Sequence, residues 1–241
     1  METVTPYNTN DSKKNQVAHM FDNIAFRYDF LNSLLSLGIH KGWRKKCIAL
    51  ISSKKPKFIL DVATGTADFA IGALKLNPTK ITGIDISEGM MKFGREKIKK
   101  INAESIINLT YGDAETCDIS DNSIDAITVG FGVRNFEHLE KGLINMNRML
   151  KPGRQICILE FSTPRKTPFK QFYKFYFKYV TPTLGKIFSK DARAYTYLPE
   201  SIKVFPDNEN FVEILNKCGY TNASYQSLSF GLAAIYLADK K

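Results

Sequence analysis

Apolar residues recur along the chain in two patterns, short uninterrupted runs and longer amphipathic segments. The short runs predict five strands, at 57–63, 80–86, 106–112, 123–132 and 154–161. Segments with helical spacing fall between them and predict helices at 68–76, 87–101 and 136–149. Strands that alternate with helices favour an α/β fold whose doubly wound sheet is mostly parallel.

Capping and breaking residues support the predicted helix ends. Ser87 is a plausible N-cap for 87–101, and the last turn of that helix is basic. Lys151-Pro152-Gly153 predicts the end of the helix at 136–149. Asp207 is the expected N-cap of a further helix at 207–217.

The two ends of the chain depart from this alternation. Residues 13–53 predict an N-terminal helical segment, and 162–206 form an insertion rich in aromatic residues and lysine. Two strands, at 221–229 and 231–239, are separated only by Ser229-Phe230-Gly231 and predict an antiparallel hairpin. The expected sheet therefore has seven strands, the C-terminal hairpin being its antiparallel part.

The composition is ordinary for a globular protein: 44% of the 241 residues are apolar and 24% are charged. No stretch of about 18 apolar residues predicts a transmembrane helix. The first fifteen residues are polar and lack the apolar stretch of a signal peptide, so we expect a cytoplasmic protein. The four cysteines lie far apart without a zinc-ligand pattern, which predicts reduced buried thiols and no metal site.

The net charge of +10 is concentrated in one segment. Residues 161–190 contain seven lysine or arginine residues and no acidic residue. A segment of this kind fits either a nucleic-acid surface or an anionic membrane surface.

The segment 61–68, Asp-Val-Ala-Thr-Gly-Thr-Ala-Asp, lies where the first strand turns into a helix. Small residues there let a ligand approach the backbone, and the helix N-terminus offers free N–H groups. Asp85 ends the second strand, 24 residues after Asp61. A carboxylate at that place accepts hydrogen bonds from a ribose diol, so the spacing predicts a nucleoside-cofactor site.

The charge of the turn favours one cofactor over another. A dinucleotide site uses G-x-G-x-x-G to hold a pyrophosphate, but this turn has one glycine, Gly65, and an acid, Asp61. S-adenosyl-L-methionine carries an ammonium and a sulfonium group that suit an acidic site. A third acid, Asp113, follows the third strand and could accept a hydrogen bond from the adenine amino group.

Further motifs resemble one family, the quinone-biosynthesis C-methyltransferases that act on demethylmenaquinone or the corresponding ubiquinone precursor. The first motif is Tyr28-Asp29-Phe30-Leu31-Asn32 with Ser36, Gly38, His40, Trp43 and Arg44. The second is Phe131-Gly132-Val133-Arg134-Asn135, after the fourth strand. The others are Leu150-Lys151-Pro152-Gly153, Glu160-Phe161-Ser162-x-Pro164, and Tyr195-x-Tyr197-Leu198-Pro199-x-Ser201 with Phe205-Pro206. Together they cover residues 17–236.

The resemblance implies a Rossmann-like, S-adenosyl-L-methionine-dependent enzyme that methylates a ring carbon of a reduced prenylated quinone precursor. Demethylmenaquinol is the favoured substrate, and action on the benzoquinol precursor or on both is left open. It adds Thr66, Asp113 and the backbone of Ala114 to the cofactor contacts. It implies one domain over 1–241, divided into an N-terminal cap (13–53), a cofactor-binding core (54–161), a substrate- and membrane-facing insertion (162–206) and a C-terminal helix and hairpin (207–241).

The substrate side is expected around Arg134, which follows strand four at the carboxyl end of the sheet. A fixed cation there favours a phenolate, and Asn135 could orient the second oxygen. His40, Tyr28 and Tyr197 are candidates for relaying the phenolic proton. For His40 and Tyr28 a purely structural role in packing is an equally open interpretation.

One residue of the turn departs from the family. Its pattern usually continues Gly-Thr-Gly-Asp, whereas this chain has Gly65-Thr66-Ala67-Asp68. Alanine restricts φ, so the cofactor turn is unaffected if Ala67 has a negative φ.

Residues 165–190 admit two interpretations. Lys166, Lys170, Lys174 and Lys178 recur every four residues, with aromatic residues between them. The segment is either a lid helix that packs on the sheet or an interfacial helix that docks transiently on the anionic inner face of the membrane. The second reading makes the enzyme a peripheral membrane protein.

Other functions stay open at this point. A non-enzymatic nucleic-acid binder would fit the net charge, but the acids at the strand ends argue against a nucleic-acid partner. An NAD(P)-dependent oxidoreductase and a methyltransferase for RNA or another small molecule are the remaining alternatives, and a homodimer is left open.

Overall fold

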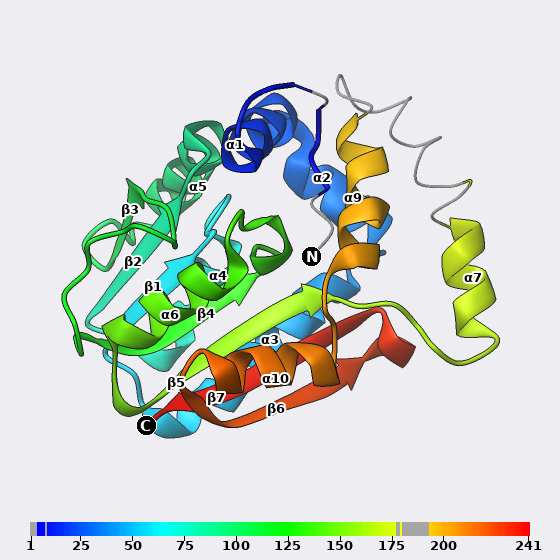
Figure 1. Cartoon of the computed structure of the whole chain (residues 1–241). Coiled ribbons are helices and arrows are strands. Elements are labelled where there is room, and N and C mark those ends of the chain that lie inside the picture. The colour runs from blue at the N-terminus through cyan, green and yellow to red at the C-terminus, as the bar shows by residue number, and fades with distance from the viewer. Residues whose placement is uncertain (1–3, 8, 177–178, 180–192) are drawn as a thin grey trace.

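A seven-stranded sheet forms the centre of the computed structural model, which describes residues 4–7, 9–176, 179 and 193–241 (Figure 1). The strand order is β3-β2-β1-β4-β5-β7-β6. Strands β1 to β5 are parallel, and β7 runs antiparallel to both β5 and β6. The strands are β1 (Phe58–Val62), β2 (Lys80–Asp85), β3 (Ile107–Tyr111), β4 (Ile124–Gly130), β5 (Leu150–Phe161), β6 (Tyr220–Leu228) and β7 (Ala233–Lys240). The predicted mostly parallel sheet with an antiparallel C-terminal hairpin is confirmed.

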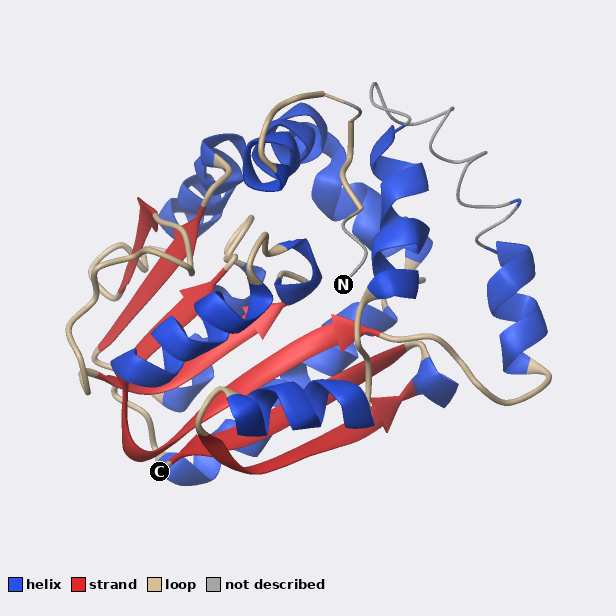
Figure 2. Cartoon of the chain, viewed as in Figure 1, coloured by secondary structure: helices blue, strands red, loops and turns tan. Residues whose placement is uncertain are grey.

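Helices cover both faces of the sheet (Figure 2). Successive side chains of β1 point to opposite faces, so Leu60 joins one apolar cluster and Ile59 another. The Leu60 face is covered by α6 (Leu139–Met149) and α10 (Glu209–Lys217). The other face is covered by α3 (Ile39–Ile51), α4 (Asp68–Ala73) and α5 (Glu88–Lys100).

A helical cap lies over the carboxyl end of the parallel strands. It consists of α1 (Lys13–Ile24), α2 (Tyr28–Leu35) and α9 (Arg193–Val204), while α7 (Phe169–Phe175) stands at the outer side (Figure 1). Val17 and Met20 of α1 pack against Tyr197 of α9, which joins two distant parts of the chain. Within the predicted N-terminal cap, α3 instead belongs to the layer on the sheet, where Trp43 is buried.

Two local expectations are wrong. Strand β5 begins at Leu150 rather than 154, because Pro152-Gly153 lies in a bulge where the register with β4 shifts. Helix α10 begins at Glu209 after Asn208, and Asp207 instead accepts a hydrogen bond from the backbone N–H of Thr163 (2.9 Å). The N-cap at Ser87 is confirmed, since its hydroxyl accepts a hydrogen bond from Met90 N.

Two further features concern membrane spans and the cysteines. Within the described residues, no helix combines the length and apolar character that crossing a membrane requires. All four cysteines are free thiols, three of them buried.

Candidate active site

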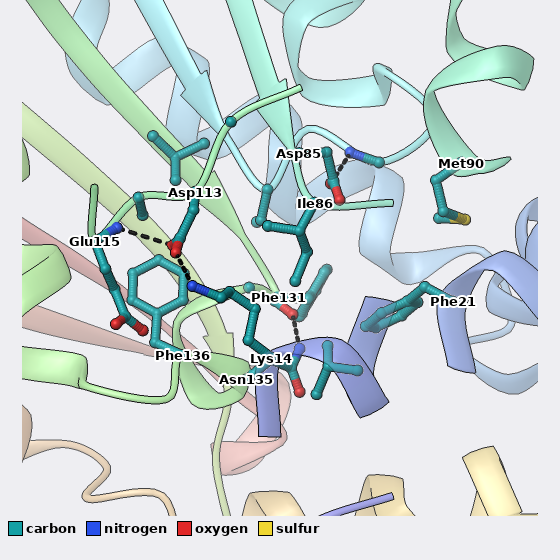
Figure 3. Close-up of a pocket in the computed structure, with 18 of the residues that line it drawn as sticks. Lys14, Phe21, Asp85, Ile86, Met90, Asp113, Glu115, Phe131, Asn135 and Phe136 are labelled. Atoms are coloured by element: carbon teal, nitrogen blue, oxygen red, sulfur yellow. Dashed lines mark hydrogen bonds and ion pairs between the residues drawn. The ribbon is translucent and has the colours of Figure 1, made fainter. Parts of the chain in front are cut away.

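An inner cavity lies at the carboxyl ends of β1, β2 and β4, beneath helix α1 (Figure 3). Its walls come from the β1–α4 turn, the end of β2, the loop after β3 and the loop after β4. Of the predicted cofactor residues, four line this cavity: Gly65, Asp85, Asp113 and Ala114. This is the edge of a parallel sheet at which ligands bind in doubly wound folds.

Asp85 is held by backbone donors on both carboxylate oxygens. Oδ2 accepts a hydrogen bond from Gly65 N (2.7 Å), and Oδ1 accepts one from Ser87 N (2.8 Å). Burial raises the pKa of Asp85 to about 6, so the carboxylate is ionised at neutral pH. Asp85 lines the cavity, and its carboxylate has further lone pairs to which a pair of ribose hydroxyls could donate.

The β1–α4 turn requires left-handed backbone at three positions. Ala63, Gly65 and Ala67 have φ values of 52°, 54° and 64°. A side chain on Gly65 would come within 3.3 Å of Met90 Cε. Ala67 therefore does not have the negative φ that would have left the turn unstrained. Left-handed backbone costs a non-glycine residue about 1–2 kcal/mol.

Asp61, near the end of β1, and Thr66, within this turn, do not line the inner cavity. Asp61 is 1% exposed and accepts hydrogen bonds from Thr64 Oγ1 (2.6 Å), Thr128 Oγ1 (2.7 Å) and Ala70 N (3.2 Å). Burial raises its pKa to about 6. These hydrogen bonds fix the shape of the β1–α4 turn beside the inner cavity.

Acidic residues also occupy the far wall of the inner cavity (Figure 3). Asp113 pairs with Lys14 Nζ of α1 (2.6 Å) and accepts a hydrogen bond from Glu115 N (2.9 Å). Glu115 accepts hydrogen bonds from the backbone N–H groups of Glu137 and His138, both at 2.9 Å. Four carboxylate residues and one lysine line the inner cavity, which suits a cationic ligand better than a pyrophosphate.

Polar contacts tie the cap to the turns after β1, β2 and β3. The Lys14–Asp113 pair is the first. Asp22 accepts hydrogen bonds from Ser87 Oγ (2.6 Å) and Gly89 N (2.9 Å). Asp29 accepts a hydrogen bond from Thr66 Oγ1 (2.7 Å). The side chains of Asp29 and Thr66 also both contact Lys97 Nζ. Helices α1 and α2 are thereby tied to every turn that carries a predicted cofactor residue.

An outer cavity of about 440 Å³ adjoins the inner one. Its walls are mainly aromatic and aliphatic side chains of α1, α2, α3, α7 and α9. Phe21, Tyr28 and Phe131 line both cavities, so the two meet at these side chains. A small cationic ligand and a large apolar one would therefore come into contact there.

Arg134 supplies a cation to the outer cavity. Its Nη1 lies 2.8 Å from Glu160 Oε1, and its guanidinium lies 5.4 Å from the centre of the Phe161 ring. Glu160 is fully buried, which raises its pKa. Among the described residues, no group accepts a hydrogen bond from Arg134 Nε.

Glu160 is a site residue that the sequence analysis did not assign. The signal was an acidic residue inside the otherwise apolar end of strand 154–161. An acid at such a place is expected to have a buried cationic partner.

The other predicted residues lie on two sides of the junction. His40 and Tyr197 line the outer cavity, Asn135 lines the inner one, and Tyr28 lines both. The Tyr197 hydroxyl donates a hydrogen bond to Asn135 Oδ1 (3.1 Å). Burial raises the pKa of Tyr28, and that of Tyr197 to about 12, so both hydroxyls stay protonated at neutral pH.

Comparisons with known proteins agree with this geometry. The model of the ubiE/COQ5 methyltransferase family matches residues 9–240. A demethylmenaquinone methyltransferase of Bacteroides fragilis is 48% identical over 99% of this chain and 98% of its own length. A ubiquinone/menaquinone biosynthesis C-methyltransferase of Geotalea daltonii is 41% identical over 95% of this chain and 97% of its own.

Solved structures share the fold at low sequence identity. The [4+2]-cyclase SpnF superposes with a TM-score of 0.68, at 16% identity, over 94% of this chain and 96% of its own. A SAM-dependent methyltransferase of Thermotoga maritima has a TM-score of 0.62 at 16% identity, covering 93% of this chain and 99% of its own. The chain belongs to the ubiE/COQ5 methyltransferase family and is an S-adenosyl-L-methionine-dependent methyltransferase.

Proposed function

We propose that the chain transfers a methyl group from S-adenosyl-L-methionine to a ring carbon of demethylmenaquinol, a step of menaquinone biosynthesis. The observation that carries this proposal is the meeting of an acidic cavity and an apolar cavity at Phe21, Tyr28 and Phe131. Relatives at 48% and 42% identity, from Bacteroides fragilis and Porphyromonas gingivalis, are named demethylmenaquinone methyltransferase.

The residues of the inner cavity fit the cofactor. S-adenosyl-L-methionine supplies the methyl group from a sulfonium centre. Asp85 would accept hydrogen bonds from the ribose hydroxyls, and Asp113 from the adenine amino group with the backbone of Ala114 beside it. Gly65 leaves room for the cofactor near the turn, and the surrounding carboxylates favour a cation.

The outer cavity fits a reduced prenylated ring. Its aromatic and aliphatic walls would hold the ring and the first part of an isoprenoid tail. The acceptor carbon must be electron-rich, so the reduced quinol is the substrate rather than the electrophilic quinone. Arg134, held by Glu160, stabilises negative charge on the quinol oxygen, and Asn135 lies next to it on the chain.

We further propose that the mouth of the outer cavity docks on an anionic membrane. Several side chains that line the cavity are also strongly exposed, among them Leu37 (86%), Phe172 (68%) and Phe175 (59%). Lys166 and Lys170 beside them are exposed. The Lys174 side chain and Lys178, which complete the predicted stripe, lie outside the described residues.

This arrangement combines both interpretations of the insertion. All four of these aromatic residues of α7 line the cavity, but Phe169 and Tyr173 are half-buried, as in a lid, while Phe172 and Phe175 are largely exposed, as in an interfacial helix. A prenylated quinol resides in the bilayer, so an apolar mouth next to lysines would collect it there.

Liposome co-sedimentation tests the docking proposal. Binding should require anionic lipid, weaken in high salt, and fall when Lys166 and Lys170 are changed to Gln or Phe172 and Phe175 to Ser. Lys99→Gln and Lys100→Gln, at the far end of α5, are the matched charge control. Equal binding by all variants would refute the docking surface.

Methyl incorporation tests the reaction. The purified enzyme with labelled cofactor should methylate demethylmenaquinol and leave the oxidised quinone, total RNA and polar small molecules unlabelled. Label in RNA without label in the quinol would overturn the proposed function and favour the alternative substrate class.

A further inference from the structure

Four polar residues form a regular series on the wall of the outer cavity. Tyr28, Asn32, Ser36 and His40 are each four positions apart, and all four line a cavity whose other walls are mainly apolar. Ser36 Oγ donates a hydrogen bond to the backbone oxygen of Asn32 (2.6 Å) and lies 2.5 Å from His40 Nδ1. The series thus joins the end of α2 to the first turn of α3.

The distances determine where the protons are. The Ser36 hydroxyl has a single proton, and two oxygen atoms 2.6 Å apart repel each other unless a proton lies between them. That proton therefore points to the Asn32 oxygen. The contact between Ser36 Oγ and His40 Nδ1 is then favourable only if Nδ1 carries a proton, which leaves the lone pair of the imidazole on Nε2.

The surroundings keep this imidazole neutral. His40 is 4% exposed, and burial lowers its pKa to about 4, with Arg44 and Lys41 lowering it further and Asp68 and Asp29 opposing them. Among the described residues, no group donates a hydrogen bond to Nε2. The lone pair is available to a ligand in the cavity.

The other polar side chains that line the outer cavity are not basic at neutral pH. The guanidinium of Arg134 has no acceptor lone pair. The side-chain amide of Asn135, beside the cavity junction, has no basic site. Tyr28 and Tyr197 have raised pKa values and stay protonated. Glu160 is paired with Arg134 and does not line either cavity.

We infer that His40 Nε2 is the proton acceptor for the substrate hydroxyl and that Ser36 is the positioning residue that fixes its tautomer. The inference rests on the proposed function, which supplies the hydroxyl. As the ring carbon forms its bond to the methyl group and the carbon–sulfur bond breaks, the O–H bond breaks and its proton passes to Nε2. Loss of the ring C–H proton and return of the hydroxyl proton restore the aromatic quinol, so one proton is released per methyl group.

Nitrogen NMR tests the tautomer without substrate or cofactor. The chain has three histidines, His19, His40 and His138, so the His40 signals can be assigned by comparison with the His40→Asn variant. At pH 7 the wild type should show a protonated Nδ1 and an unprotonated Nε2. The Ser36→Thr variant should keep this pattern, and Ser36→Ala should give a tautomer mixture. A protonated Nε2 in the wild type would overturn the inference.

Kinetics test the catalytic role. Asparagine at position 40 keeps an N–H donor near Ser36 but removes the acceptor. The His40→Asn variant should bind S-adenosyl-L-methionine within about twofold of wild type and lose on the order of 100-fold in turnover. Added imidazoles should restore turnover, more effectively as their basicity rises, and the exposed control variant His138→Asn should behave as wild type.

The outcomes separate the two proposals. Turnover of His40→Asn close to wild type, or a loss that no imidazole restores, would overturn the role of His40. If wild-type enzyme fails to methylate demethylmenaquinol, the proposed function is wrong, while the NMR result still decides the tautomer.

Discussion

Arg134 Nη1 and Glu160 Oε1 lie 2.8 Å apart at the wall of an apolar cavity, and the carboxylate is completely buried. The pair joins the loop after β4 to the end of β5 and fixes the guanidinium in one place. Its Phe161 neighbour adds a cation–π contact at 5.4 Å. A cation held in this way can respond to charge on a ligand without first reorganising.

Removing only one member of this pair should destabilise the fold. Glu160→Gln leaves the buried guanidinium without a counter-charge and should lower the free energy of unfolding by about 3 kcal/mol or more. The double variant Arg134→Gln/Glu160→Gln should recover much of that loss, because no unpaired charge remains. Urea denaturation measures both, and a single variant as stable as wild type would show that the pair is not isolated from solvent.

Asp85→Ala should weaken cofactor binding by about 2 kcal/mol, roughly a 30-fold rise in Kd, because two charge-assisted hydrogen bonds are lost. In the wild type, affinity should also fall as the pH drops below about 6, where the Asp85 carboxylate becomes protonated. Calorimetric titration measures both effects. Asp121→Ala, which removes an exposed partner of Arg148, is the control, and an equal effect at both positions would refute the placement.

Ala67→Gly should stabilise the protein. Relief of the left-handed backbone is worth about 1–2 kcal/mol, and loss of one buried methyl group costs about 0.8 kcal/mol, which leaves a gain of about 0.2–1.2 kcal/mol. Gly38→Ala is the matched reverse test, since Gly38 has a φ of 76° and open space around it. The midpoint temperature of thermal unfolding should rise for Ala67→Gly and fall for Gly38→Ala. A lower midpoint for Ala67→Gly would show that packing of the Ala67 methyl group outweighs the backbone strain.

His40 should make stability depend on pH in a defined window. Its folded pKa of about 4 lies below the ordinary 6.5, so the unfolded chain takes up the proton first as the pH falls. Relative to His40→Asn, the wild type should therefore lose stability between pH 6.5 and 4 and show a constant difference above pH 6.5. Paired unfolding curves across this range measure it, and a difference that grows above pH 7 would contradict the lowered pKa.

The sequence predicted the sheet well because its evidence is local. Alternating runs and helical spacing identify each element, and a short link such as Ser229-Phe230-Gly231 predicts the hairpin. Pro152-Gly153 was misjudged because a bulge and a turn share the same local residues, and only the pairing with β4 separates them.

The location of the site could be predicted from the sequence, but the role of each residue in it could be predicted only in part. Asp61 has the sequence position of a ligand-binding acid, yet its carboxylate accepts a hydrogen bond from Thr128 on the neighbouring strand and does not line the cavity. Glu160 and Arg134 are 26 residues apart, and their contact depends on how the loop after β4 packs against the end of β5. Tertiary contacts of this kind leave no periodic signal in a sequence.

The most direct test of two cavities with separate tasks is to measure cofactor Kd and quinol turnover on one variant, Arg134→Gln/Glu160→Gln. Both charges are removed together, so the fold is not left with an unpaired buried charge. The structure predicts a Kd for S-adenosyl-L-methionine within about threefold of wild type, and turnover on demethylmenaquinol reduced on the order of 100-fold. A variant that loses cofactor affinity but keeps its turnover at saturation would contradict the account.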